Sequence, residues 1–200
     1  TECVARFHRA QSVWKQRQRP RAAPLFAEAE TACQHAQNRD LVVRALYQGA
    51  RCLASAGERD KALALYTRIE SEFPEHRFAD DARLRAAEVL TDGGDDDGAE
   101  QRLRDLPDRY PKGDVASEAL WRLALAAWRA GDWDKSLHWL DEDLRRFPRE
   151  EIYYAAGRAH YWRGRILEKQ GARDEARQAY VRAVREYPLS VYAFFALERM

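Results

Sequence analysis

The sequence predicts an all-α protein built from repeated helical hairpins. Its 200 residues are 46% hydrophobic and 34% charged, and they include only seven prolines. Alanine, arginine, leucine and glutamate, which favour helices, are abundant, and no segment shows the alternation of a strand. Four glycines are each followed by a proline seventeen residues later, which indicates a structural repeat.

The repeat occurs in four units, with spacings of 37, 37 and 40 residues between them. Each unit has a small residue seven positions before its glycine, another five positions after it, and an aromatic residue directly before its proline. Glycine closes a first helix, the small residues let two helices approach closely, and proline ends the second helix. The turn glycines are Gly57, Gly94, Gly131 and Gly171, and the small residues before them are Ala50, Ala87, Ala124 and Gly164.

Eleven helices are expected along the chain from this pattern. Each first helix should end at a turn glycine, and each second helix at the aromatic residue before a proline. Pro107 lies inside the sixth helix and is expected to kink it or end it early. The expected helices span residues 2–18, 23–37, 41–56, 59–73, 79–92, 96–109, 115–130, 133–147, 150–170, 174–187 and 190–200.

The helices fall into two expected regions. Residues 1–40 should form an N-terminal capping hairpin, because they lack the repeat signature and can shield the first repeat from solvent. Residues 41–200 should hold the four repeats and a terminal helix. That last helix would need a further element to pack on.

The recurring glycine, alanine, aromatic and proline positions resemble the tetratricopeptide repeat over roughly residues 41–190. The resemblance implies a right-handed superhelix of about five helical hairpins in which first helices line a concave surface. These units are longer than the family's roughly 34-residue standard. Longer helices or looser loops are therefore expected.

The resemblance also marks a candidate binding surface. The residue ten positions before each turn glycine should point into the concave face, together with the residue one turn later. Aromatic side chains flanked by arginines can stack on sugar rings or anchor an extended peptide. The alternative is that these side chains fill space between the helices. The residues are Tyr47, Arg51, Leu84, Glu88, Trp121, Leu125, Tyr161 and Arg165.

Charge and motifs argue against several classes of function. The chain has 34 Lys and Arg against 33 Asp and Glu, so no overall field draws it to nucleic acid or an anionic membrane. The basic first 21 residues are interpreted as a solvated cap face, with contact to an anionic polymer as the alternative. No apolar run is long enough to span a membrane. We expect no catalytic residue, cofactor or metal ligand, because no phosphate loop, nucleophile elbow or zinc spacing occurs.

Two smaller features are read from spacing. Asp92 to Gly98 looks like a calcium loop but lacks the acidic residues at its two ends, so an acidic inter-helix loop with an N-cap is expected. Cys3 and Cys33 lie at similar heights on the first two helices if the hairpin turns near Pro20. A disulfide between them is possible and stays open, whereas Cys52 is expected to be a buried thiol.

The C-terminal quarter carries a more particular resemblance. Tyr154 to Lys169 and Tyr187 to Met200 contain A-x-Y-W-x-x-R-like and P-x-S-x-Y-A-x-x-A-x-x-R-like stretches. They resemble the end of the helical region of soluble lytic transglycosylases, which cleave peptidoglycan in the bacterial periplasm. This implies a non-catalytic scaffold, a fragment whose catalytic domain would follow Met200. The possible partners are a protein or peptide, a glycan strand or that catalytic domain.

Glu70 imitates the first half of that family's E-S-x-F catalytic motif. The G-A-x-G-L-M-Q stretch is missing, however, and Phe73 and Pro74 are the recurring end of a repeat. Glu70 is therefore expected to face solvent beside Glu72 and to be non-catalytic.

The middle repeats support an alternative. The stretches from Phe73 to Asp81 and from Tyr110 to Ala116 are similar to tetratricopeptide segments of envelope adaptors in outer-membrane assembly and the Tol-Pal system. Both resemblances imply a Gram-negative periplasm.

Overall fold

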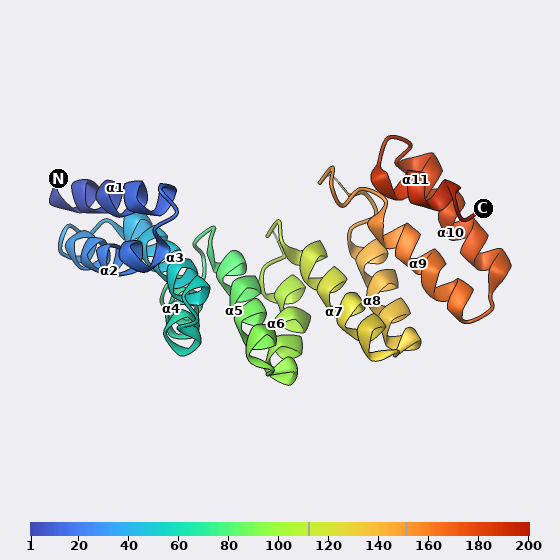
Figure 1. The fold of residues 1–200 in the computed structure, drawn as a ribbon, viewed down its shortest axis with the longest axis horizontal. Helices are drawn as coiled ribbons and strands as arrows, with labels where there is room; N and C mark the ends of the chain where they lie inside the picture. Colours follow the sequence, from blue (N-terminus) through green and yellow to red (C-terminus); the bar gives the residue numbers. More distant parts are fainter. Residues whose placement is uncertain (112, 151) are drawn as a thin grey trace. The chain divides into compact units, whose positions relative to one another are not determined.

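The computed structural model describes residues 1–111, 113–150 and 152–200, and within them it forms eleven α-helices and no strand (Figure 1). The predicted all-α class and the helical repeat are therefore confirmed. The helices are α1 (Glu2–Lys15), α2 (Arg19–His35), α3 (Arg39–Ser55), α4 (Arg59–Glu72), α5 (Ala79–Gly93), α6 (Asp96–Arg109), α7 (Ala116–Ala130), α8 (Trp133–Arg146), α9 (Arg158–Lys169), α10 (Arg173–Glu186) and α11 (Val191–Leu197).

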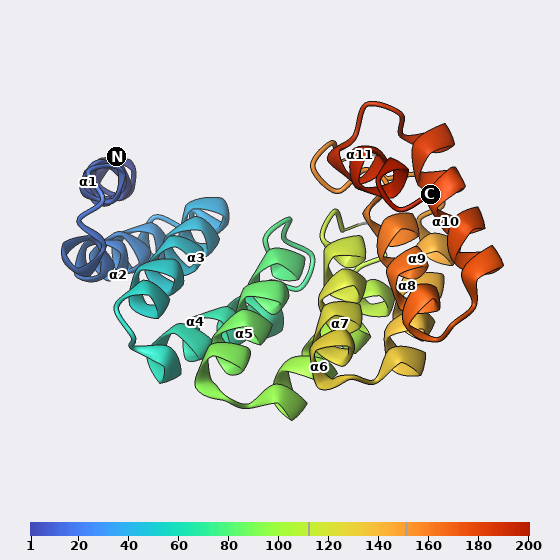
Figure 2. The same ribbon diagram turned by 45° about the vertical axis from the view of Figure 1, so that its right-hand side comes forward.

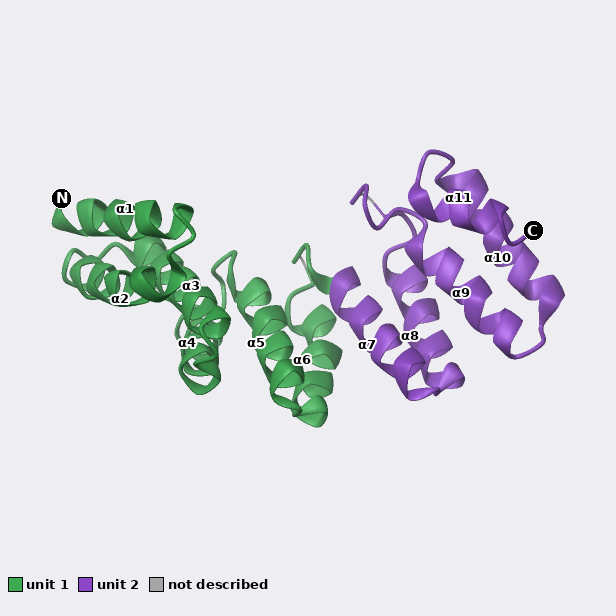
Figure 3. Ribbon diagram, in the orientation of Figure 1, with its two compact units in different colours: residues 1–116 green, residues 117–200 purple. Residues whose placement is uncertain are grey.

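The helices form two compact units, residues 1–116 and residues 117–200 (Figure 3). In the first unit, α1 packs on α2, α3 on α4 and α5 on α6, so that neighbours in sequence are neighbours in space. In the second unit α9 and α10 lie side by side (Figure 2), and α11 packs against both. Each hairpin thus buries the faces of its two helices against each other.

The repeat positions have the roles that their residue types require. The turn glycines Gly57, Gly94, Gly131 and Gly171 have φ of 80, 84, 78 and 82°, in the left-handed region that favours glycine. The small residues in the first helices are buried, with exposed fractions of 0% for Ala50 and 1% for Ala87 and Ala124. The sequence pattern therefore located the helix turns and the close helix contacts correctly.

Two helix predictions need correction. The helix expected at 150–170 begins only at Arg158, because Gly157 adopts φ of 80° and is held against Ser190 and Tyr187, contacts that a local pattern does not contain. Pro107 does not end α6 early, since the helix runs to Arg109. Pro107 costs one backbone hydrogen bond there, but it is buried beside Leu106, so packing favours continuing the helix.

The N-terminal hairpin is closed by a disulfide between Cys3 and Cys33, which settles the possibility left open by the spacing. The hairpin turns at residues 16–18, before Pro20, which lies in the first turn of α2 where proline is tolerated. Phe7 and Phe26 pack edge to face across it, 6.0 Å between ring centroids. Cys52 is a free, buried thiol, as predicted.

The expected N-cap before α6 is confirmed, because the Asp95 carboxylate accepts a hydrogen bond from the Gly98 amide at 2.9 Å. The expected acidic loop is shorter than the Asp92 to Gly98 run: Asp92 lies in α5 and Asp96 and Asp97 lie in α6. Among the described residues, no group of three or more His, Cys, Asp or Glu side chains is placed to hold a metal ion. No described helix combines the length and apolar character that crossing a membrane requires.

Two helix-interior glycines should respond oppositely to alanine. A Cβ on Gly164 of α9 would lie 2.7 Å from Cδ1 of the buried Tyr180 ring, so Gly164→Ala should lower the unfolding free energy by about 1–3 kcal/mol. A Cβ on Gly49 of α3 would lie 3.5 Å from Phe26 Cβ, an ordinary contact. Gly49→Ala should therefore raise stability by about 0.5–1 kcal/mol, because alanine favours helix. Urea denaturation measures the unfolding free energy of both variants. A change of the same sign in the two variants would contradict the prediction.

Candidate functional site

Aromatic side chains of α7 and α9 meet on one face of the second unit, here called the α7–α9 face and defined by Trp121, Trp128, Arg158, Trp162 and Arg165. Trp121 and Trp128 lie two turns apart on α7, and the other three lie at intervals of four and three on α9, so each set shares a helix face. The Trp162 ring lies 5.5 Å from Trp121 and 5.1 Å from Trp128 between centroids. All three tryptophans are half-buried. Their remaining surface is available to a partner.

Two arginines lie over these rings. The Arg158 guanidinium is 4.7 Å from the Trp121 ring centroid and donates to Glu118 Oε2 at 2.9 Å. The Arg165 guanidinium is 6.0 Å from Trp128 and 5.8 Å from Trp162. Guanidinium groups over indole faces are favourable cation–π arrangements. Arg158 is only 8% exposed, so the face presents flat apolar surface next to the positive charge of Arg165.

Tyr161 has a different environment from Trp121. It is only 7% exposed and packs against Tyr180, Tyr192 and Phe195, with centroid distances of 5.8–5.9 Å. Its hydroxyl accepts a hydrogen bond from Arg165 at 3.0 Å. Tyr161 therefore fills the core under the face and orients Arg165.

The equivalent residues of the first unit lie largely in its core. Tyr47 is 6% exposed and stacks on Phe78 at 4.8 Å, and Leu84 is 4% exposed. Burial, with the nearby Asp81 carboxylate, raises the pKa of the Tyr47 hydroxyl. Arg51 lies 5.4 Å from the Trp14 ring centroid and 5.9 Å from that of Tyr47. In the first unit, the side chains at the predicted binding positions therefore mainly pack in the core.

The sequence-predicted site residues are thus divided between the two units. Trp121 and Leu125 are half-buried on α7, Tyr161 and Arg165 contact each other on α9, and Tyr47 contacts Arg51 in the first unit. Glu88 on α5 pairs with Arg85 at 2.7 Å. A binding role for these residues stays a prediction. The spacing rule omitted Trp128, Arg158 and Trp162, although they share helix faces with the residues that it selected.

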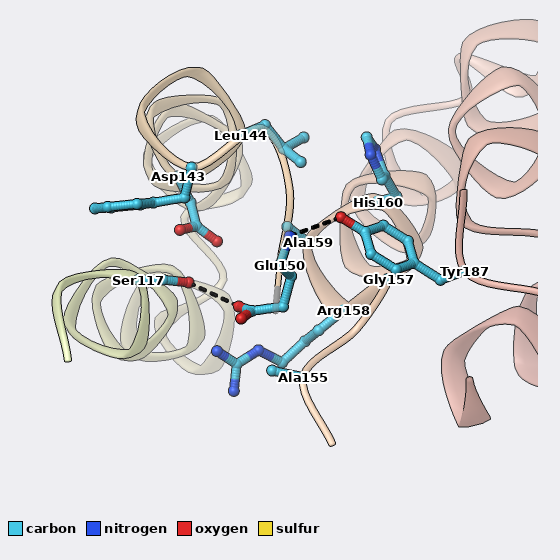
Figure 4. Close-up of a pocket in the computed structure, with 11 residues that line it drawn as sticks. Ser117, Asp143, Leu144, Glu150, Ala155, Gly157, Arg158, Ala159, His160 and Tyr187 are labelled. Carbon is cyan, nitrogen blue, oxygen red and sulfur yellow. Dashed lines mark hydrogen bonds between the residues drawn. The ribbon is translucent and has the colours of Figure 1, made fainter. Parts of the chain in front are cut away.

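A second cluster of polar groups surrounds a small cavity in the second unit (Figure 4). Its volume is about 10 Å³, and its lining includes Ser117, Asp143, Glu150, Arg158, His160 and Tyr187. This is roughly the space that one water needs. The cavity is therefore too small to be a substrate pocket.

Asp143 is the unusual group in this cavity. It is 5% exposed, and its Oδ1 atom has no hydrogen-bond partner. Burial raises the pKa of its carboxyl to about 7; Glu150 and Glu118 add to the shift, while Ser117 and Arg158 oppose it. Burial also lowers the pKa of His160, whose Nε2 lies 3.3 Å from Glu186 Oε2. The cluster thus combines two buried titratable groups.

Comparison with known proteins identifies the architecture. A family model described as "Tetratricopeptide repeat-like domain" matches residues 9–194. The chain belongs to this tetratricopeptide repeat-like family. No curated protein sequence matches it significantly.

Several solved structures share the fold. MamA residues 41-end from Desulfovibrio magneticus RS-1 matches with 17% identity and a TM-score of 0.62, covering 92% of this chain and 94% of that one. BtubC from P. vanneervenii matches with 16% identity and a TM-score of 0.68, covering 88% and 76%. A Podosopora anserina protein of nearly identical TPR-like repeats matches with 14% identity and a TM-score of 0.64, covering 94% and 95%. At these identities the likeness shows the fold alone.

Glu70 requires a correction within this fold. It was expected to face solvent, but it is 5% exposed. Arg83 Nη1 donates to one of its carboxylate oxygens at 2.7 Å, and Arg102 donates to the other. The partners lie on α5 and α6, 13 and 32 residues along the chain, so α4 alone gives no sign of them. Glu70 therefore cross-links three helices of the first unit.

Proposed function

We propose that this tetratricopeptide repeat-like chain is a non-catalytic scaffold that binds a protein partner on the α7–α9 face. The observation that carries the proposal is the set of three half-buried tryptophans with two guanidinium groups over their rings. Tryptophan and arginine are the residues that most often dominate binding energy at protein interfaces. The same surface could stack on sugar rings, so a glycan strand is the competing ligand.

The partner chemistry follows from the face. The exposed part of the indole surface favours an apolar or aromatic side chain, and Arg165, 23% exposed, offers a donor to a carboxylate or carbonyl oxygen. An extended peptide with an aromatic residue and a nearby acidic residue satisfies both. This is the ligand class that the proposal specifies.

We further propose that the scaffold acts in a Gram-negative periplasm, as the helical region of a peptidoglycan lytic transglycosylase. The Cys3–Cys33 disulfide supports an oxidising compartment, since structural disulfides persist there. The sequence stretches of α9 and α11 support the transglycosylase assignment by resemblance. An adaptor of an envelope complex, of the outer-membrane assembly or Tol-Pal type, is the alternative supported by the α5 and α7 regions.

The reading frame after the Met200 codon distinguishes these two assignments. An E-S-x-F motif followed by G-A-x-G-L-M-Q supports the transglycosylase region, whereas a stop codon supports the adaptor. The isolated chain should not turn over purified peptidoglycan. Measurable turnover would contradict both assignments.

Loss of Trp121 should weaken binding on the α7–α9 face. An array of bacterial envelope peptides supplies the ligand, and calorimetric titration measures its affinity. Trp121→Ala should lower that affinity about 10- to 30-fold, the effect of a central anchor. Trp139→Ala is the matched control, because Trp139 is a half-buried tryptophan of α8 whose ring contacts His138.

Circular dichroism first establishes that both variants keep the wild-type fold. Equal affinity of wild type and folded Trp121→Ala would remove this face from the proposal. Binding of purified glycan strands, with no peptide bound, would replace the protein partner by a glycan.

A further inference from the structure

Two side chains, Glu150 and Tyr187, help to hold the connection between α8 and α9. Its described residues are 147–150 and 152–157, whereas the α4–α5 connection covers only residues 73–78. The Ser117 hydroxyl donates to Glu150 Oε2 at 3.1 Å, and the Ile152 amide donates to Glu150 Oε1 at 2.9 Å. The Glu150 amide donates to the Tyr187 hydroxyl at 2.8 Å (Figure 4). Glu150 therefore ties the connection to the start of α7 and the end of α10.

Asp143 competes for the same hydroxyl. Its carboxyl group lies beside Ser117 in Figure 4 and interacts with that hydroxyl. A serine hydroxyl has only one proton to donate. If Asp143 is ionised, two carboxylates face one donor. Glu150 still accepts from the Ile152 amide, whereas the buried Asp143 Oδ1 has no hydrogen-bond partner.

We propose that Asp143 holds a proton that completes a hydrogen-bond chain, in which Asp143 donates to Ser117 Oγ and Ser117 donates to Glu150. Loss of that proton turns Asp143 into a second acceptor. The Ser117–Glu150 bond then weakens, and the connection loses its attachment to α7. The hydrogen-bond chain Asp143–Ser117–Glu150, here called the fastening, thus attaches the connection to α7 in a pH-dependent way.

The charges around Asp143 leave its ionised form poorly compensated. The acidic groups are Glu118 on α7 and Glu150 on the connection. Arg158 on α9 donates to Glu118 at 2.9 Å, so its charge is shared with another carboxylate. His160 on α9 pairs with Glu186, and Tyr187 accepts from the Glu150 amide. The protonated form of Asp143 is uncharged and therefore avoids the repulsion from Glu118 and Glu150.

The direction of the pH dependence follows from linkage. The pKa of folded Asp143, about 7, lies above its ordinary value of 3.8, so the folded state binds this proton more tightly than the unfolded state. Its contribution to stability is therefore fully present below about pH 4, declines as the pH rises to about 7 and stays low above it. His160 acts in the opposite sense, because its lowered pKa costs stability when the pH falls below about 6.5.

NMR of the whole chain tests the fastening between pH 5 and 9. Carboxyl carbon shifts report Asp143, and amide shifts report Ile152, which donates to Glu150. In wild type the two signals should change with the same midpoint, near pH 7. In Asp143→Asn, whose amide is a permanent donor, the Ile152 signal should lose that transition and the thermal midpoint at pH 8 should rise.

Two further variants make the result decisive. Ser117→Ala removes the hydroxyl that links Asp143 to Glu150. Asp143 should therefore still titrate, while the Ile152 amide shift no longer changes with it. His160→Gln removes the other buried titrating group, and the Ile152 transition should survive. An Asp143 midpoint below pH 5, an Ile152 transition retained in Asp143→Asn, or one lost in His160→Gln would each overturn the proposal.

Discussion

Glu70→Ala should destabilise the first unit by about 3–5 kcal/mol, the usual cost of removing one partner of a buried ion pair. Glu70 and Arg83 are 5% and 7% exposed, so the arginine left behind would lie buried with less compensation. Arg83 keeps the Arg102 carbonyl at 2.9 Å and Asp105 at 3.3 Å, which places the expected loss toward the lower end of that range. Urea denaturation followed by far-ultraviolet circular dichroism measures the loss.

Glu72→Ala is the matched control for Glu70→Ala. Glu72 lies two residues away on α4 and pairs with Arg68 at 3.2 Å, but its side chain is 49% exposed. Exposed pairs of this kind contribute about 0–1 kcal/mol. Equal destabilisation by both substitutions would contradict the assigned burial of Glu70.

Reduction of the Cys3–Cys33 disulfide should remove about 3–4 kcal/mol from the stability of the N-terminal hairpin. The bond closes a loop with a sequence separation of 30, and cross-links of that length restrict the unfolded chain by roughly this free energy. Comparing urea transitions with and without dithiothreitol measures the effect. The Cys3→Ala, Cys33→Ala double variant should match the reduced protein and show no further response to reductant.

Thiol counting gives an independent check of the disulfide. The chain has three cysteines, and Cys52 is the free one. Unreduced protein, once denatured, should therefore release one titratable thiol per chain. A count of three would contradict the bond.

The repeat architecture was predictable because its determinants are local. A glycine at a left-handed position, an alanine at a helix contact and a proline after a second helix each act within a few residues. Gly57, Ala50 and Pro74 therefore mark the first repeat by their residue types and spacing alone. The pattern also requires the small residues at the helix contacts to be buried. Ala87 and Ala124 are each only 1% exposed.

The site was less predictable because its geometry depends on contacts between distant residues. Tyr161 and Trp121 occupy the same repeat position, yet α11 and α10 cover the first and leave the second half-buried. The start of α9 depends on Gly157 being held against Tyr187, 30 positions along the chain. Asp143 gave no sequence signal, since its environment is assembled from α7, α9 and the intervening connection.

The tryptophans are so unevenly distributed that their fluorescence can follow the second unit separately from the first. Five of its six tryptophans lie in residues 117–200, namely Trp121, Trp128, Trp133, Trp139 and Trp162, and only Trp14 lies in residues 1–116. Intrinsic fluorescence will therefore report almost entirely on the second unit, while far-ultraviolet circular dichroism will record helix loss in both. Disagreement between the two melting curves would show that the units unfold in separate steps, because coincident transitions are the mark of a single one.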